Sequence, residues 1–274
     1  MPKRARSKSK SVRALGVDVG GSGVKGAPVD VKAGTLVEKR ERIPTPKPST
    51  PEAVAETVAA LVDRFDWTGP VGCTIPGRVR NGIVETAANI DRSWTGVDAA
   101  ALLRERLGRP VAVINDADAA GLAEVRYGAG QDCDGVCLVL TFGTGIGSAL
   151  FLKSRLVPNL EFGHLELDGQ LAERAAASSA REREGMSWEA WAQERVQPYL
   201  DHVEFLLSPD LIIIGGGVSR PERWSIFGPL LKTKARLAPA ALGNEAGIVG
   251  AALMARSLAA QEKAARARKK RAGA

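Results

Sequence analysis

The 274-residue sequence contains three cysteines, two histidines and no long apolar run. An odd number of cysteines argues against a disulfide framework and favours a reducing, cytoplasmic location. No apolar run approaches the roughly 18 residues that a membrane span needs, so we expect no contact with a membrane. The basic start MPKRARSKSKSVR is not followed by an apolar stretch of about 7–15 residues, so we expect no secretory signal.

The few cysteines and histidines also limit the possible metal sites. Cys73 and Cys137 lie within strand-like segments and are expected to be small core residues. Cys133 lies four residues before Cys137, but no second pair is nearby, so we expect no metal there. His202 falls in a helical pattern and is expected to be structural, which leaves His164 as the histidine of interest.

Positive charge is concentrated at the two ends of the chain. The net charge is +7, yet twelve of the 38 Lys and Arg residues lie in 1–13 and 263–271, and acids outnumber bases in the remainder. We expect both ends to be unstructured. These ends either keep the chain in solution or bind a polyanion, which would be nucleic acid or a phosphate polymer. Composition alone does not distinguish the two roles.

Thirty glycines spread among short apolar runs predict an α/β architecture with tight strand connections. A strand, a glycine turn and a second strand occur in GVDVGGSGVKG and again in LVLTFGTGIGSAL, which indicates two similar lobes. The predicted parts are a basic tail over 1–13, an N-terminal lobe over 14–115, a C-terminal lobe over 116–260 whose final helix packs back on the first lobe, and a basic tail over 261–274.

Local patterns predict the individual elements. Expected strands are 14–19, 24–31, 35–45, 70–77, 111–114, 136–143, 147–153, 154–158 and 211–217. Expected helices are 52–65 capped by Thr50 or Ser49, 97–108 ending at Gly108, a helix after residue 115, helical patterns in 171–207, and 244–263. In 171–207 the residues Trp188, Trp191 and Phe205 are expected to pack in the core.

The first glycine turn, GGSGVKG, contains a formal G-x-G-x-x-G at residues 21–26. A dinucleotide fold needs a helix to begin here, and the sequence predicts a strand instead. The Walker pattern is absent because Gly26 follows Lys25. What remains is a turn with free backbone N–H groups beside Asp18, Ser22 and Lys25, which suits an anion. A tight hairpin alone explains the glycines but not Asp18 inside an apolar strand.

Two acids stand where a predicted strand meets a helix, in VAVINDADAAGLAE. Removing an ionised carboxylate from water costs several kcal/mol unless it is paired, so packing alone does not explain Asp116. Its alternatives are a functional carboxylate or a helix N-cap. We expect Asp118 to point elsewhere, as a cap or a surface acid.

The segments LGVDVGGSGVKG, TIPG, NDADAAGLAE, LTFGTGIGSAL, EFGH and LIIIGGG, in this order, resemble the sugar kinases of the ROK family. Within it, the chain is similar to the polyphosphate glucokinases over about 14–255. The resemblance implies a two-lobed actin-like, ribonuclease-H-like ATPase fold with a central cleft. Many ROK members carry a cysteine-rich zinc motif after the EFGH-like segment. No cysteine follows Cys137, so we expect no zinc, and the acid that replaces the sugar-binding Glu after that motif stays open.

The resemblance implies transfer of a phosphoryl group from inorganic polyphosphate, or also ATP, to the 6-hydroxyl of glucose, in a homodimer that uses Mg²⁺. Asp116 is then the general base, and Asp18 orients Mg²⁺ through water. The implied glucose contacts are Asn89, Asn115, Asp116, Glu161, His164 and Glu166, with Asp168 a weaker candidate. The implied donor contacts are Gly20, Gly21, Ser22, Gly23, Lys25, Thr144, Gly145, Gly216 and Gly217.

Two alternatives stay open. The first is an ATP-only hexose or amino-sugar kinase on the same scaffold. The second is a sugar-responsive regulator, for which 13 residues before the first lobe are too few to form a helix-turn-helix domain, so we expect no nucleic-acid partner. A phosphate polymer needs a long basic groove. Its candidates are Arg78, Arg80, Arg220, Arg223, Lys232, Lys234 and Arg236.

Overall fold

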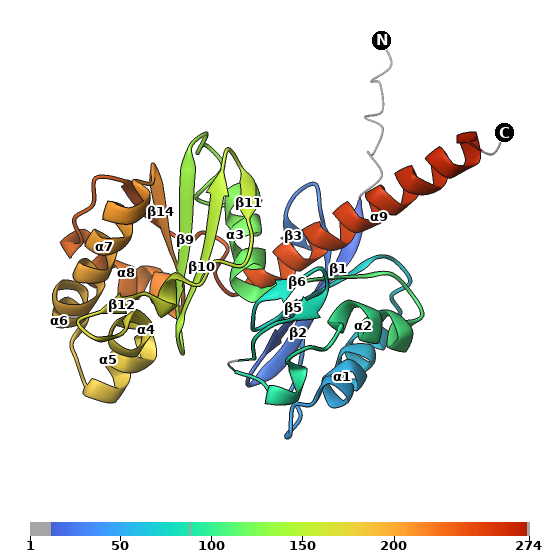
Figure 1. Cartoon of the computed structure of the whole chain (residues 1–274), viewed down its shortest axis with the longest axis horizontal. Helices are drawn as coiled ribbons and strands as arrows, with labels where there is room; N and C mark the ends of the chain where they lie inside the picture. Colours follow the sequence, from blue (N-terminus) through green and yellow to red (C-terminus); the bar gives the residue numbers. More distant parts are fainter. Residues whose placement is uncertain (1–11, 88, 273–274) are drawn as a thin grey trace, which may run out of the picture.

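The computed structural model describes residues 12–87 and 89–272 (Figure 1). Two α/β bodies lie side by side, and the last helix crosses from the junction between them over the body that contains the first strands. Most of the predicted N-terminal tail, 1–11, lies outside the described residues. Arg13 already belongs to the first strand.

The first sheet joins antiparallel and parallel strands in the order β3-β2-β1-β5-β8. Its strands are β1 (Arg13–Gly20), β2 (Gly23–Asp30), β3 (Thr35–Leu36), β5 (Val71–Ile75) and β8 (Val111–Asn115), and β4 (Glu41–Ile43) also pairs with β2. β1, β2 and β3 are antiparallel neighbours, whereas β1, β5 and β8 run parallel. The strand predicted over 35–45 is thus two short strands, β3 and β4.

The second sheet repeats this arrangement, in the order β11-β10-β9-β14-β15. Its strands are β9 (Val136–Phe142), β10 (Ile146–Leu152), β11 (Arg155–Val157), β14 (Leu211–Gly216) and β15 (Arg236–Pro239). β9, β10 and β11 are antiparallel neighbours, and β9, β14 and β15 are parallel. The repeat read from the two glycine hairpins is therefore confirmed. β15 was not predicted, because it is short and only partly buried.

The early helices begin and end where their signals stand. α1 (Pro51–Asp63) is capped by Thr50, whose hydroxyl accepts the Ala53 N–H. α2 (Ala99–Leu107) ends at Gly108 in the left-handed conformation, with φ of 62°. The remaining helices are α3 (Asp116–Tyr127), α4 (Ala172–Ala176), α5 (Ser178–Glu184), α6 (Trp188–Trp191), α7 (Gln197–Leu207), α8 (Pro221–Phe227) and α9 (Ala246–Ala272).

Shorter elements complete the described chain. They are the hairpins β6 (Val79–Arg80) with β7 (Ile83–Val84) and β12 (Glu166–Leu167) with β13 (Gln170–Leu171), the 3₁₀ turns η1 (Arg92–Trp94), η2 (Phe162–His164), η4 (Gly217–Ser219), η5 (Gly228–Leu230) and η6 (Gly243–Glu245), and the π-helical stretch η3 (Ala192–Val196). Pro198 follows η3 in the first turn of α7, where it provides no backbone N–H for a regular ladder.

Aromatic residues form the centre of the second body. Trp191 packs edge-on against Phe142 and Phe227, with ring centroids 5.6 and 5.2 Å apart. Its indole N–H donates to the Ala176 carbonyl at 3.0 Å. The prediction that Phe205 joins this core is wrong, since its side chain is 83% exposed. The buried face of α7 contains Val203, and Phe205 lies two residues further round the helix.

The final helix is longer than predicted. α9 continues to Ala272, so the expectation of an unstructured tail from 261 is wrong. The run AAQEKAARARKKRA contains strong helix formers with neither Gly nor Pro, and its Lys and Arg residues suit the negative end of a helix.

α9 lies directly against the first sheet and α3. A Cβ added at Gly16 of β1 would lie 1.8 Å from the Ile248 carbonyl oxygen, and one at Gly72 of β5 would lie 1.8 Å from that of Ala251. A Cβ added at Gly250 of α9 would likewise lie 1.8 Å from the Ala119 carbonyl oxygen of α3. Here backbone touches backbone, which only glycine permits.

The lobe boundary at residues 115 and 116 stays a prediction, because α3 contacts both sheets as well as α9. Cys73 and Cys137 are buried in the core, as predicted. None of the helices in the described ranges is long and apolar enough to cross a membrane.

Gly72→Ala should destabilise the fold. The new methyl group would overlap the Ala251 carbonyl, and overpacking of this kind costs about 1–3 kcal/mol. We expect the melting temperature to fall by roughly 2–4 °C per kcal/mol. Gly143→Ala is the matched control, because a Cβ there meets nothing within 4 Å. Equal melting temperatures for the two variants would contradict this packing.

Candidate active site

Asp116 is the first residue of α3 and follows β8 directly. The preceding Asn115 fixes this junction: its Oδ1 accepts the Asp118 N–H at 2.9 Å, and its Nδ2 donates to the Gly77 carbonyl at 3.0 Å. The Asn115 Oδ1 thus caps the helix. One amide N–H remains for a ligand.

The Asp116 carboxyl is partly buried, and its Oδ1 accepts the Ala117 N–H at 3.0 Å. Burial, and after it the negative charges of Asp18 and Glu161, raise the pKa of Asp116 to about 7. Asp18 belongs to β1 and Glu161 to the loop before η2, so negative charge from two separate segments acts on Asp116. A carboxylate with a pKa near neutrality is well suited to accept a proton.

Asp18 lies in a polar row across the first sheet. It pairs in register with Lys25 of β2 and Thr74 of β5. The Thr74 hydroxyl donates to its Oδ1 at 2.9 Å, and the Lys25 ammonium lies 3.9 Å from its Oδ2. Gly247, at the start of α9, lies beside the same carboxylate. The carboxylate therefore faces the junction of the two bodies.

Both glycine turns contain exposed residues, and each turn also contacts another segment of the chain. In the first, Gly21 lies against the Asn89 backbone, where an added Cβ would be 2.9 Å from the carbonyl oxygen, and Ser22 is exposed. In the second, Ser179 of α5 donates its N–H to Gly143 and its hydroxyl to the Thr144 carbonyl, at 3.0 and 2.6 Å. Both turns present backbone to solvent, as an anion site requires.

The EFGH segment is anchored to β10 by Ser148. The Ser148 hydroxyl donates to the Leu160 carbonyl at 2.7 Å and accepts the Phe162 N–H at 2.9 Å. His164 Nδ1 lies 3.7 Å from Glu161 Oε2. Burial raises the pKa of Glu161, against the opposing charges of His164 and Arg78.

Glu173 of α4 also lies at this segment, and the sequence analysis missed it. Its Oε1 is 3.5 Å from His164 Nε2, and its Oε2 accepts the Ile146 N–H at 3.3 Å beside Gly145. An imidazole thus lies between two carboxylates. The sequence shows Glu173 only as one acid in a helical pattern rich in charge, so no local signal distinguishes it.

The residues after EFGH are less involved. Glu166 is exposed on β12, and no contact found among the described residues joins it to Asp116. Asp168 has a φ of 52° and occupies the β12–β13 turn with Gly169, which explains it structurally.

Asp118 is neither a cap nor a surface acid, and that prediction is wrong. Its side chain is buried, 2% exposed, because it points under the loop before EFGH. Its Oδ2 accepts the Asn159 N–H at 3.1 Å, and Asn159 Oδ1 accepts the Val79 N–H at 2.9 Å. Burial raises the pKa of Asp118 to about 6, and the charge of Glu161 adds to it. This chain of hydrogen bonds connects α3 to the β6–β7 hairpin.

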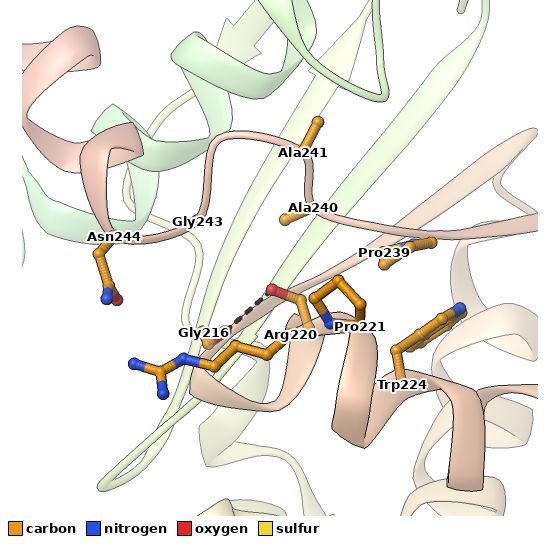
Figure 2. A pocket seen from close by; sticks show the side chains of 10 residues that line it. Gly216, Arg220, Pro221, Trp224, Pro239, Ala240, Ala241, Gly243 and Asn244 are labelled. Carbon is orange, nitrogen blue, oxygen red and sulfur yellow. Dashed lines mark hydrogen bonds between the residues drawn. The ribbon is translucent and has the colours of Figure 1, made fainter. Parts of the chain in front are cut away.

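A pocket of about 440 Å³ opens at the carboxyl end of β14 (Figure 2). Its lining residues are Gly216, Ser219, Arg220, Pro221, Trp224, Pro239, Ala240, Ala241, Gly243 and Asn244. Trp224 and Pro239 lie at one end, whereas Arg220 and Asn244 lie at the other. We call this the nucleoside pocket, after the ligand that is proposed for it below. Part of its lining, Pro239, Ala240, Ala241 and Gly243, comes from a segment that the sequence analysis assigned to no helix or strand.

Of the two glycines predicted to contact the donor here, Gly216 lines the pocket and Gly217 does not. Gly216 has a φ of 84°, and an added Cβ would lie 2.4 Å from the Phe142 carbonyl, so only glycine fits. The Ser219 hydroxyl donates to the Gly216 carbonyl at 2.9 Å. Gly217 is not part of the lining, and its carbonyl accepts from Arg223 at 2.8 Å.

The seven basic residues proposed for a polymer groove lie in three segments of the chain, 78–80, 220–223 and 232–236. Arg78 and Arg80 pair with Glu85, at 3.8 and 3.0 Å. Arg220 lines the nucleoside pocket. Arg236 begins β15, at the end of that strand opposite to the pocket, with Lys232 and Lys234 just before it. That these segments share one groove stays a prediction.

Comparison with known proteins gives one consistent result. The polyphosphate glucokinase of Mycobacterium tuberculosis is 50% identical over 241 residues, covering 87% of this chain and 89% of its own. The polyphosphate glucokinase of Mycobacterium leprae is 49% identical, and the match covers 88% of this chain and 74% of that protein. The crystal structure of the inorganic polyphosphate/ATP-glucomannokinase from Arthrobacter sp. strain KM matches with a TM-score of 0.84 and 52% identity, over 89% of this chain and 98% of that one.

A glucokinase from Streptomyces griseus, solved with glucose and AMPPNP, is 25% identical with a TM-score of 0.76, over 90% of this chain and all of that one. These structures confirm the predicted actin-like fold. Residues 14–195 match the ROK family itself, and the chain belongs to that family.

Proposed function

We propose that the chain transfers a terminal phosphoryl group from inorganic polyphosphate, or from ATP, to the 6-hydroxyl of glucose. The observation that supports this most is the position of Asp116, a carboxylate with a pKa near 7 between the anion-binding turns and EFGH. The names of the similar proteins, polyphosphate glucokinase and polyphosphate/ATP-glucomannokinase, support the substrates.

Asp116 is the general base. Phosphoryl transfer needs an acceptor hydroxyl in line with the donor and one group to accept its proton. The helix start and the Asn115 cap hold the Asp116 carboxylate in place, so little reorganisation is needed when the proton moves.

Glucose binds between Asp116 and the EFGH segment. Each sugar hydroxyl both donates and accepts hydrogen bonds, which suits the carboxylates of Glu161 and Glu173 with His164 between them. The free amide N–H of Asn115 and the exposed Asn89 are further contacts in this proposal. Glu173 takes the role of the acid that follows the zinc motif in other family members.

Mg²⁺ fits the single carboxylate of Asp18. The described residues hold no group of three or more His, Cys, Asp or Glu side chains placed to bind a metal. This suits Mg²⁺, which keeps several waters and binds donor phosphates through one or two carboxylates. When bound it neutralises charge on the donor. Lys25 and the N–H groups of the turns at 20–23 and 143–145 hold the donor's terminal phosphates.

The nucleoside pocket supports ATP as a second donor. Its apolar end, Trp224 and Pro239, suits a base, and its polar end faces the phosphates with Arg220 and Asn244 (Figure 2). A phosphate polymer has nothing to place against Trp224.

We also propose that the chain acts in the cytoplasm as a homodimer. All three cysteines are free thiols in the interior, which suits a reducing compartment. Phe205 and Leu206 of α7 are 83% and 50% exposed, and side chains of this kind commonly lie at interfaces.

Asp116→Asn should reduce kcat by at least about 100-fold, because a general base contributes about 10²–10⁴ in rate. Glucose binding, measured by calorimetry, should persist because the amide keeps the shape of the side chain. Asp132→Asn, at an exposed loop residue, is the matched control and should keep full turnover. Near-normal turnover of Asp116→Asn with polyphosphate and with ATP would refute the assignment.

The pH profile should report Asp116 directly. The base acts only when deprotonated, so kcat/KM should fall about tenfold per pH unit below a midpoint near 7. In Glu161→Gln the midpoint should move to lower pH, because the charge of Glu161 raises the pKa of Asp116. An unchanged midpoint in that variant would argue against the proximity of the two groups.

Trp224→Ala should raise KM for ATP roughly 5–150-fold, since stacking of a base on an aromatic ring is worth about 1–3 kcal/mol. The ratio of kcat/KM for ATP to that for polyphosphate should fall accordingly. Thermal unfolding checks the fold, because Trp224 also packs against Phe227. A ratio that stays constant would place the nucleoside elsewhere.

A further inference from the structure

We propose that a polyphosphate chain, beyond its reacting end, lies on a basic strip formed by Lys25, Lys39, Arg40 and Arg42, and does not enter the nucleoside pocket. The inference rests on the proposed function and assigns the residues that recognise the polymer. None of the last three was a candidate from the sequence, where they form part of an ordinary charged segment, VEKRERIP.

The sheet register places the strip beside Asp18. Residues directly opposite each other in antiparallel strands project from the same face. Asp18 pairs with Lys25 on β2, and Lys25 pairs with Arg42 on β4. The three side chains therefore form one row on one face of the first sheet, leading outward from the catalytic junction.

Arg42 reaches the first donor turn. Its Nη2 donates to the Ser22 carbonyl at 2.6 Å, and its guanidinium lies over Gly23, where an added Cβ would be 2.5 Å from Nε. The absence of a side chain at Gly23 thus makes room for this cation. A phosphate held by the turn at 20–23 would have Arg42 as its neighbour.

Arg40 continues the strip toward the other body. Its Nη1 donates to the Asn244 carbonyl at 3.3 Å, across a groove of about 530 Å³. The groove is lined by Leu36, Glu38, Lys39, Arg40, Leu242, Asn244 and Glu245. Asn244 also lines the nucleoside pocket, so two paths leave the donor turns and separate at this residue.

Three cations of the strip, Lys39, Arg40 and Arg42, are available to a ligand, whereas Lys25 already pairs with Asp18 at 3.9 Å. The two acids of the groove, Glu38 and Glu245, form no ion pair with Lys39, Arg40 or Arg42 among the described residues. Arg40 and Arg42 each donate to a neutral carbonyl, so their charge is not neutralised and further N–H groups remain.

The chemistry of the strip suits phosphate and not a base. Guanidinium groups bind phosphate oxygens in pairs, and each unit of inorganic polyphosphate carries a negative charge. The groove contains no aromatic side chain, whereas the nucleoside pocket contains Trp224. The first path therefore fits a phosphate polymer, and the second fits a nucleoside.

The test compares long-chain polyphosphate with tripolyphosphate as donors, by the ratio of their kcat/KM values in the same variant. Tripolyphosphate is too short to use the far part of the strip. The long-chain advantage should fall about tenfold for each guanidinium removed in Arg40→Ala and Arg42→Ala, and it should become less sensitive to salt. Arg40→Lys and Arg42→Lys should keep most of it.

Arg104→Ala is the control, because Arg104 is an exposed arginine on α2, and the ratio should not change. Lys39→Ala combined with Arg40→Ala is a second variant, since neither residue contacts the donor turn, and it should also lower the ratio. The proposed strip would be overturned if these variants kept the long-chain advantage, or if their kcat/KM fell equally with long-chain polyphosphate and with tripolyphosphate. A wild-type enzyme without any long-chain advantage would also overturn it. The proposed function fails in a different way, if the wild type forms no glucose 6-phosphate from any phosphate donor.

Discussion

The close contact of α9 with β1, β5 and α3 sets the geometry of the site. Gly16 and Gly72 allow the helix backbone to lie on the sheet, and Gly250 allows it to lie on α3. The same helix begins beside Asp18, while α3 begins with Asp116. One helix thus contacts both the strand that contains Asp18 and the helix that begins with Asp116, and so helps to fix how the two carboxylates lie relative to each other. A shift of α9 would change this arrangement, even though α9 contains neither acid.

Burial and nearby like charges give Asp116 the pKa that the proposed reaction needs. Asp18, Asp116 and Glu161 come from β1, α3 and the loop before η2. Burial, and after it the charges of Asp18 and Glu161, raise the pKa of Asp116 to about 7. Such an arrangement costs stability, and a chain retains it where reactivity requires it. The Lys25 ammonium, 3.9 Å from Asp18, offsets part of this repulsion on the donor side.

Local signals in the sequence predicted much of the fold. Each glycine hairpin, the Thr50 cap and the Gly108 stop depend on neighbours in the chain, so they can be read directly. Asp116 stood out because a carboxylate at the end of a buried strand has no packing reason to be there. Longer-range relations could not be read. Glu173 meets His164 only because α4 folds back.

The errors have the same origin. Asp118 looks exposed in a helical pattern, yet the loop containing Asn159 covers it. The basic residues at 78–80 and 232–236 are similar in charge to Arg42, and only the sheet register shows that Arg42 lies beside Lys25. Trp224 and Asn244 are 20 residues apart and line one pocket through the path of β15.

The hydrogen bonds around Asn159 also constrain movement. Asp118 binds Asn159, Asn159 binds Val79, and Asn115 binds Gly77. The Asn159–Val79 bond joins the loop before EFGH to the first body, and the Asp118–Asn159 bond joins the same loop to α3. The Asn115–Gly77 bond lies within the first body, where it fixes the end of β8. Separating the two bodies at this edge would therefore require the Asn159–Val79 bond to break.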